Sequence, residues 1–387
     1  ARVGKIYHTA KHSPDAHWDE NPPRFANDEM PIVTKARKAF EAEHGSIKGK
    51  NRQAWLAKLE TLGPQTLSQR TARPHGPSGL TDEQHKDGKG ARAVIEHLES
   101  RPYGDQPFFI ACGIMKPHIP FLAPDKYFDM YPRENLKFVA PPADFWDQAP
   151  QSAKLDRYTR YDLEFSKENP EIRREYMQSY HACITFIDTQ IGLIFDTLKQ
   201  TGQWENTIVV LTSDHGFQLG EHFMWGKGTL FEVVNRVPMI IRVPEGLKGA
   251  TQPGTKSEGL IELLDLYPTL AELCKVDTPD DLQGRSLVPM LQDPNAKGKD
   301  AVYTVVCRPS RLKVPLDEAV LGYAVRTPRW RYAKWPDGEE LYDLKNDPME
   351  WKNLAQSPEH KRTLEAMRAE LEQAQQKAGT QRRDAHP

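Results

Sequence analysis

One segment limits the possible folds more than any other: a long amphipathic helix that leads directly into a run of β-branched residues. Residues 207–212 read Thr-Ile-Val-Val-Leu-Thr, which is typical of a strand buried in a parallel sheet. Before it, residues 171–201 carry apolar side chains at steps of three and four, which predicts a helix that Gly202 ends. Alternation of helix and buried strand without hairpins is typical of a layered α/β fold.

The same alternation recurs through the first three quarters of the chain. Helices are predicted at residues 87–101 and 260–275, and short apolar strands at 108–114 and 237–243. We therefore expect residues 1–297 to form one α/β domain with a mostly parallel sheet and helices on both faces.

The spacing of apolar runs changes near residue 298. Short runs then follow one another closely, and a charged helix is expected at 358–377. We expect residues 298–387 to form a small C-terminal α+β subdomain, with a short antiparallel sheet and the terminal helix against it. The four runs predicted as its strands are 302–307, 319–326, 330–335 and 339–344.

Composition excludes several classes of protein. A net charge of −2 over 387 residues excludes a strongly basic nucleic-acid binder, and no apolar run reaches the roughly 18 residues of a membrane span. The four cysteines are scattered without a Cys-x-x-Cys pair, so neither a disulfide scaffold nor a thiolate metal site is indicated. Residues 9–85 are polar and rich in proline, which predicts a long insertion with short helices such as 51–61.

The strongest indication of chemistry is the sequence Ser-Asp-His-Gly at residues 213–216, directly after the predicted strand 207–212. Ligands of open α/β sheets gather at the carboxyl ends of strands, so Asp214 and His215 could both reach a cation bound there. A carboxylate favours a hard cation such as Ca²⁺ or Mg²⁺, whereas the histidine leaves Zn²⁺ open. The alternative is structural: Asp214 caps the following turn and His215 is exposed to solvent.

The residues after this tetrapeptide make the pattern specific. Three residues separate it from Gly220-Glu221-His222, four more lead to Lys227, and the next predicted strand follows. This order resembles the sulfatase family of the alkaline phosphatase superfamily, and within it the iduronate-2-sulfatase-like branch. Other segments fit the resemblance in the same order: Gly-Lys-Ile-Tyr-His at 4–8, Lys-Pro-His-Ile-Pro-Phe at 116–121, and Leu-Tyr-Asp-Leu-Lys-Asn-Asp-Pro at 341–348 with Glu350 and Asn353.

The resemblance implies an alkaline-phosphatase-like fold and one pocket built from six side chains. Asp214 and His215 would bind one divalent cation, which is usually Ca²⁺ in this family, with Mg²⁺ and Zn²⁺ left open. The four side chains that would act on the sulfate ester are Lys5, His8, His118 and Lys227. Of these, His118 would face the leaving oxygen, which needs a proton or a cation nearby. By itself, a histidine in a proline-rich loop or a lysine near a terminus is more often an ordinary surface residue.

One tempting nucleophile stands in the wrong place for this family. Residues 307–311 read Cys-Arg-Pro-Ser-Arg and match the sulfatase motif Cys-x-Pro-Ser-Arg, whose cysteine is oxidised to formylglycine, the nucleophile. In the family that motif precedes the segment around Lys5 and begins a helix. Here it ends a predicted strand, and Pro315 is incompatible with a helix after it. We expect Cys307 to lie well outside the pocket of Asp214, and the nucleophile to lie outside this chain.

These features predict a sulfatase that hydrolyses sulfate esters of a sulfated carbohydrate by a metal-assisted formylglycine mechanism. Two alternatives stay open: a phosphodiesterase or phosphonate hydrolase of the same superfamily, and a noncatalytic glycan-binding relative. The expected partners are the sulfated carbohydrate and a missing amino-terminal segment or subunit, with no nucleic acid and no membrane span. The resemblance also implies a periplasmic, secreted or lysosomal-type compartment.

Overall fold

The computed structural model describes residues 1–6, 18, 31–47, 49–62, 75–138, 140–155, 170–247, 249–250, 252–308 and 319–384. The chain divides into two units. Unit one comprises residues 1–138 and 158–205, and unit two comprises residues 139–157 and 206–387. The domain boundary expected at residue 298 stays a prediction.

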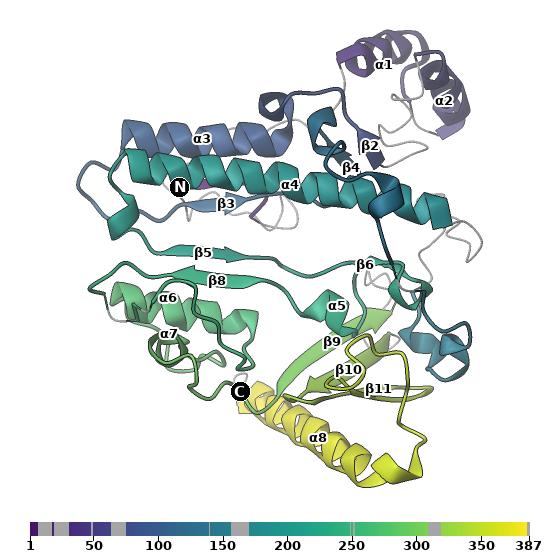
Figure 1. The fold of residues 1–387 in the computed structure, drawn as a ribbon, viewed down its shortest axis with the longest axis vertical. Coiled ribbons are helices and arrows are strands. Elements are labelled where there is room, and N and C mark those ends of the chain that lie inside the picture. Colours follow the sequence, from purple (N-terminus) through teal and green to yellow (C-terminus); the bar gives the residue numbers. More distant parts are fainter. Residues whose placement is uncertain are drawn as a thin grey trace. The chain divides into compact units, whose positions relative to one another are not determined.

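Two long helices lie side by side in unit one (Figure 1). Helix α3 (Lys86–Ser100) and helix α4 (Pro170–Gln200) agree to within one residue with the helices that periodicity predicts. Helix α3 ends because Arg101 adopts a left-handed conformation with φ 46°, and its N–H donates to the His97 carbonyl at 3.2 Å. Among the described residues, no helix is long and apolar enough to cross a membrane.

The buried face of α4 differs from the stripe that periodicity indicates. Isoleucines such as Ile187 and Ile191 fit the predicted stripe, yet both are only half-buried. The buried stripe instead includes Gln190, whose Nε2 donates to Asp82 Oδ2 at 3.1 Å. This bond satisfies a buried carboxylate, so a polar side chain occupies a core position. The buried residues of α4 are Tyr176, Met177, Ser179, Ala182, Cys183, Phe186, Gln190, Thr197 and Leu198.

Two short parallel pairs of strands position loops in unit one. These strands are β1 (Arg2–Gly4), β2 (His75–Pro77), β3 (Ala111–Gly113) and β4 (Phe121–Ala123). Strand β1 pairs with β3, which occupies part of the predicted strand 108–114, and β2 pairs with β4. Lys5 directly follows β1, and its N–H donates to the Gly113 carbonyl at 2.8 Å. The carboxyl ends of β1 and β3 therefore lie side by side, where the loop that carries His118 begins.

A separate hydrophobic cluster joins helices α1 (Pro31–His44) and α2 (Arg52–Glu60) within the predicted insertion. Helix α2 confirms the short helix predicted near 51–61, whereas α1 was not singled out by its sequence pattern. Its cluster residues Val33, Ala36 and Phe40 do recur at steps of three and four, but only two of them are large apolar side chains. The buried members of the cluster are Val33, Phe40, Trp55 and Leu59.

In unit two, the predicted strand 207–212 forms β5 (Val209–Thr212) and pairs with β8 (Met239–Arg242). The pair is antiparallel rather than parallel. A parallel pair needs a crossover, usually a helix that packs back along the sheet. Residues 213–238 connect β5 to β8 and hold a short hairpin and the four-residue helix α5 (Glu232–Asn235), not a long crossover helix. The side chains of β5 are half-buried or exposed, since the described residues pair β5 with β8 alone.

Smaller elements complete this part of unit two. Strands β6 (Gln218–Leu219) and β7 (Trp225–Gly226) form a short antiparallel hairpin between β5 and α5. Helix α6 (Leu266–Cys274) forms the second half of the helix predicted at 260–275, and helix α7 (Val288–Gln292) follows it.

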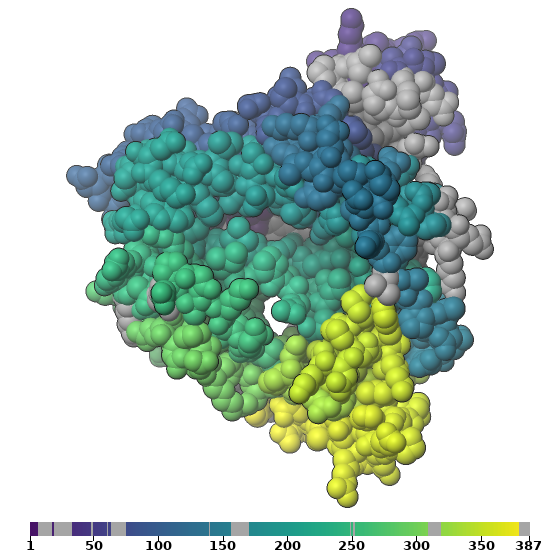
Figure 2. Space-filling view, in the orientation of Figure 1, coloured from purple at the N-terminus to yellow at the C-terminus, as the bar shows by residue number. Residues whose placement is uncertain are grey.

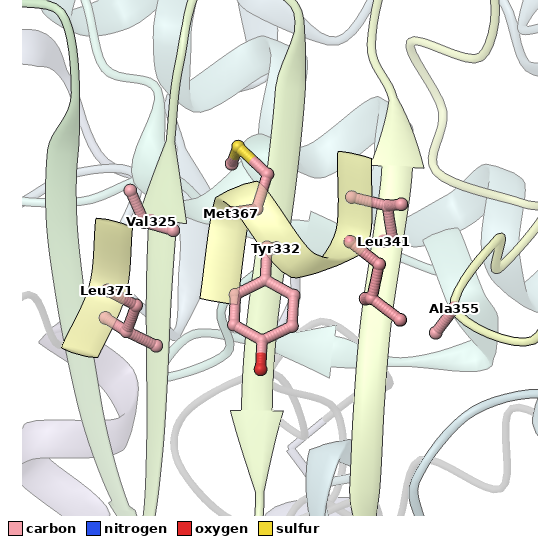
Figure 3. Packing of buried hydrophobic residues seen from close by; sticks show 7 residues of the cluster. Val325, Tyr332, Leu341, Ala355, Met367 and Leu371 are labelled. Atoms are coloured by element: carbon pink, nitrogen blue, oxygen red, sulfur yellow. The ribbon is translucent and has the colours of Figure 1, made fainter. Parts of the chain in front are cut away.

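Four antiparallel strands and a long helix form the C-terminal part of unit two, as the spacing of apolar runs predicts. The strands are β9 (Val302–Arg308), β10 (Val320–Arg326), β11 (Trp330–Trp335) and β12 (Gly338–Asp343), in the spatial order β12–β11–β10–β9. Helix α8 (Lys361–Asp384) covers the sheet through one hydrophobic cluster (Figure 3). The buried members of this cluster are Val325, Tyr332, Leu341, Ala355, Leu364, Met367 and Leu371. The described residues toward the C-terminus, coloured yellow, gather in one part of the surface (Figure 2).

Candidate active site

The turn after β5 carries the two predicted cation ligands and is fixed by backbone contacts. The Gly216 N–H donates to the Val234 carbonyl at 2.7 Å, which holds the turn close to α5. A Cβ atom on Gly216 would lie 2.2 Å from the Val233 carbonyl oxygen, so only glycine fits here. The Ser213 hydroxyl donates to the His215 carbonyl at 2.9 Å and closes the turn.

The orientation of the His215 ring is set by the next residue. Its Nδ1 lies 2.8 Å from the Gly216 carbonyl oxygen, which can only accept, so Nδ1 carries the hydrogen. Nε2 therefore presents a lone pair, and the Lys227 ammonium donates to it at 2.5 Å. Asp214 Oδ1 lies 3.5 Å from the same nitrogen. Three of the six predicted site residues thus converge at one point of unit two.

The hairpin of β6 and β7 presents Lys227, which is the first residue after β7. Gly220 and Gly226 adopt φ values of 102° and 130°, which disfavour any side chain. Arg308 Nη1 donates to the Gly228 carbonyl at 2.7 Å. This bond ties the residue after Lys227 to the end of β9.

His222, from the Gly-Glu-His sequence, is a buried structural residue of this hairpin. Its Nε2 donates to the Met349 carbonyl at 2.9 Å, and its ring stacks on Phe231 with the centroids 3.9 Å apart. Burial lowers the pKa of His222 to about 4, so the ring is neutral at ordinary pH. The Trp146 indole donates to the His222 carbonyl at 3.0 Å. Both side chains therefore hold the loop that presents Lys227.

A buried charge cluster is joined to the same loop. Arg331 is 1% exposed and its Nε donates to Glu350 Oε1, while its Nη1 lies 3.7 Å from Glu340 Oε2. Glu350 Oε2 accepts the Glu232 N–H at 2.7 Å, at the start of α5. Burial raises the pKa of the Glu350 carboxyl to about 7, although the Arg331 guanidinium opposes this shift. One guanidinium thus serves two buried carboxyl groups and connects β11 with α5.

In unit one, the loop after β3 carries His118 and is held from helix α3. Asp87, in the first turn of α3, accepts the N–H groups of Met115 and Lys116, both at 2.8 Å. The Lys116 ammonium donates to the Pro120 carbonyl at 2.7 Å. These bonds brace the loop on both sides of His118, whose side chain is exposed.

The six predicted site residues fall into three groups. In unit two, Lys227 contacts His215, and Asp214 approaches the same ring nitrogen. In unit one, Lys5 and His118 belong to loops that leave two neighbouring parallel strands. His8 lies outside the described residues. That all six share one pocket stays a prediction.

Asp214 and His215 fit part of a cation site. Across the ranges that the structure describes, no three His, Cys, Asp or Glu side chains gather closely enough to hold a metal ion. The pair does place two donor atoms 3.5 Å apart, and Ca²⁺ binds its ligands at about 2.3–2.6 Å, so both atoms can contact one ion. Because Ca²⁺ takes about six to eight ligands, the pair supplies only part of the shell.

Cys307 is a strand residue, as its context predicts. It lies in β9 opposite Leu321 of β10, and its side chain is half-buried. The neighbouring Arg308 stacks on Trp335, with its guanidinium carbon 5.4 Å from the ring centroid. The rest of the motif, residues 309–311, lies outside the described residues. That Cys307 is far from Asp214 and is not the nucleophile stays a prediction.

Comparison with known proteins identifies the class to which this fold and site belong. The sulfatase family model matches residues 47–276, and the model of the C-terminal part of N-sulphoglucosamine sulphohydrolase matches residues 220–377. Since the first match covers more than half of the chain, the chain belongs to the sulfatase family.

Individual relatives define the similarity further. A sulfatase of Formosa agariphila is 33% identical over 306 residues, which cover 78% of this chain and 56% of that protein. Human iduronate 2-sulfatase is 29% identical over 339 residues, which cover 69% of this chain and 62% of that protein. The chain therefore spans little more than half the length of these curated relatives.

Solved structures confirm the predicted α/β class with an alkaline-phosphatase-like fold. Phosphonate monoester hydrolase from Silicibacter pomeroyi superposes with a TM-score of 0.69 and 21% identity, over 97% of this chain and 77% of that one. At this identity the likeness shows the fold alone.

Proposed function

We propose that the protein containing this chain hydrolyses sulfate esters of sulfated carbohydrates. The observation that carries the proposal is the convergence of Asp214, His215 and Lys227 after β5 in a chain of the sulfatase family. A reacting sulfate ester spreads negative charge over its nonbridging oxygens, which an ammonium group and a bound cation stabilise. A carbohydrate substrate is supported by the relative named after the sugar acid iduronate.

One divalent cation accompanies this site in the family, and we assign it to Ca²⁺ held by Asp214 and His215. When bound, the ion supplies Lewis-acid stabilisation of negative charge on the ester. His215 Nε2 has one lone pair, which the Lys227 ammonium contacts at 2.5 Å. Lys227 must therefore leave this nitrogen when a cation is bound, and its ammonium then becomes available to the sulfate.

Proton transfer to the leaving oxygen is assigned to His118. Its Nδ1 lies 2.6 Å from the Ile119 carbonyl oxygen, which only accepts, so Nδ1 holds a hydrogen. In the imidazolium form Nε2 carries a second hydrogen, which it passes to the leaving oxygen, and the ring is left neutral with its hydrogen on Nδ1. Lys5 and Lys227 stabilise charge on the nonbridging oxygens, and His8 is assigned to the same region by resemblance.

The nucleophile is proposed to be a formylglycine that lies outside this chain, in an amino-terminal segment or subunit. Cys307 does not supply it in this proposal, because its backbone is held in the ladder between β9 and β10. A periplasmic, secreted or lysosomal-type compartment is proposed on family resemblance alone.

The test is hydrolysis by the protein produced from its complete reading frame. We expect sulfate release from 4-nitrophenyl sulfate and from sulfated saccharides, with slower attack on phosphate diesters and phosphonate esters. Asp214→Ala should abolish metal-dependent activity, whereas Asp300→Ala, which removes an exposed ion pair with Lys297, should leave it unchanged. Faster hydrolysis of phosphonate esters would favour the phosphonate hydrolase. Binding of sulfated glycans without hydrolysis would favour the noncatalytic relative.

A further inference from the structure

We propose that Asp87 is a positioning residue for His118, and that it determines how well the protein cleaves esters with poor leaving groups. The inference rests on the proposed function for one point, the role of His118 as proton donor. Asp87 acts only through the loop of residues 114–120 that carries His118.

The contact between Asp87 and this loop uses the whole carboxylate. Oδ1 accepts the Met115 N–H and Oδ2 accepts the Lys116 N–H, both at 2.8 Å. The residue is 6% exposed, so water contributes little to its solvation. Hydrogen bonds to an ionised acceptor are roughly twice as strong as neutral ones. The carboxylate therefore fixes two consecutive peptide groups directly before the turn of His118.

The carboxylate is itself held by a rigid element. Asp87 stands in the first turn of α3, where the helix dipole stabilises a negative charge. Helix α3 packs along α4 and also against β1 and β3. Because Lys5 follows β1 directly, the same helix sets the loop of His118 relative to the backbone of Lys5. A site held from a regular element is defined more sharply than one held by loop contacts alone.

Two further bonds carry this constraint to His118. The His118 N–H donates to the Met115 carbonyl at 2.9 Å, and the Lys116 ammonium donates to the Pro120 carbonyl at 2.7 Å. Of the two residues that Asp87 fixes, Met115 is thus bonded to His118, and Lys116 is bonded to Pro120 at the end of the loop. Loss of the carboxylate would leave two N–H groups without their acceptor, and the loop would shift to find new ones.

A shifted His118 has a specific chemical consequence. A sugar alkoxide is a poor leaving group and needs a proton as the S–O bond breaks, whereas 4-nitrophenolate leaves without one. General acid catalysis contributes about 10²–10⁴-fold to rates, and this contribution is available only to the first kind of ester. A positioning defect at His118 should therefore slow sugar sulfates and spare aryl sulfates.

The experiment compares Asp87→Asn with Asp105→Asn, an exposed aspartate in the same unit, and with His118→Ala, all in the full-length protein. Turnover of a sulfated monosaccharide by Asp87→Asn should fall by about tenfold or more, and that of 4-nitrophenyl sulfate by less than about threefold. Asp105→Asn should resemble the wild type for both substrates. Equal losses on both substrates, or no loss on either, would overturn the inference.

A second measurement, which does not depend on enzymatic activity, tests the contact between Asp87 and the two N–H groups. Asparagine keeps one acceptor oxygen, so hydrogen exchange of the Met115 or the Lys116 amide, whichever faces the NH2 group, should accelerate in Asp87→Asn and stay slow in Asp105→Asn. Unchanged exchange of both amides in Asp87→Asn would overturn the inference. If Asp87→Asn does not fold, Lys116→Met, which removes the bond from the ammonium to the Pro120 carbonyl, should show the same selective loss on the sugar sulfate. If His118→Ala slows both substrates equally, the proposed proton-donor role fails, and with it the selective effect assigned to Asp87.

Discussion

Replacement of Arg331 by methionine should lower the free energy of unfolding by about 3–5 kcal/mol, because it removes one partner of a buried ion cluster. The Arg331 side chain is 2% exposed, and its partners Glu350 and Glu340 are 2% and 0% exposed. The substitution leaves both carboxyl groups buried without their cation. It also removes the guanidinium that lies 4.9 Å from the Phe231 ring centroid and 4.7 Å from that of Tyr342. Methionine keeps most of the apolar stem, so the loss is mainly electrostatic.

Lys334→Met is the matched control, since it removes a cation from the same strand, β11. Lys334 lies 3.6 Å from Glu372, with side chains 46% and 48% exposed, so its loss should cost about 0–1 kcal/mol. The assay is urea-dependent hydrogen exchange of peptides from β9 to β12, at a pH of about 8 where the Glu350 carboxyl is mostly ionised. If Arg331→Met and Lys334→Met lower the free energy of unfolding equally, the view that the buried cluster stabilises this sheet is refuted.

Glu350 should make the stability of unit two depend on pH. Its folded pKa of about 7 lies above its ordinary 4.5, so the folded state binds more protons and stability falls as the pH rises through this window; Glu350→Gln should flatten that slope in urea unfolding at several pH values. Cys307→Ala should leave sulfate release nearly unchanged, and a folded but inactive variant would identify Cys307 as the nucleophile. Gly216→Ala should abolish calcium binding measured by titration calorimetry, because its Cβ would lie 2.2 Å from the Val233 carbonyl oxygen. Gly192→Ala, whose Cβ meets no atom within 4 Å, is the control, and equal calcium binding by both would contradict the role of the turn.

Local periodicity predicts the long elements of this fold well and their pairing poorly. Helices α3 and α4 match their predicted bounds to within one residue, because apolar side chains recur in each at steps of three and four. The direction of β8 beside β5 depends on the path of the connection between them, and no pattern within either strand contains that information. Polar Gln190 in the buried stripe of α4 likewise depends on Asp82, which lies 108 residues away.

The candidate site shows the same division. Asp214, His215 and Lys227 can be predicted because a short segment places all three, and the turn that joins them is local. Asp87 and Arg331 were not predicted as parts of the site. Their partners lie 28 and 19 residues away along the chain, and in sequence each resembles an ordinary charged residue of a helix or strand. Only the folded backbone shows that Asp87 faces two N–H groups.

The contacts of the hairpin that presents Lys227 also determine at what point of protein synthesis this hairpin can reach its final conformation. His222 is bonded to the carbonyl of Met349, and the N–H of Glu232 to the side chain of Glu350, across 127 and 118 residues of sequence. A nascent chain that ends before residue 349 can form β5 and the turn after it, but it lacks the acceptors that hold His222 of the hairpin and the start of α5. The lysine is therefore the last part of its cluster to be fixed in place, and a premature stop codon in β11 or β12 would disable the site from more than a hundred residues downstream.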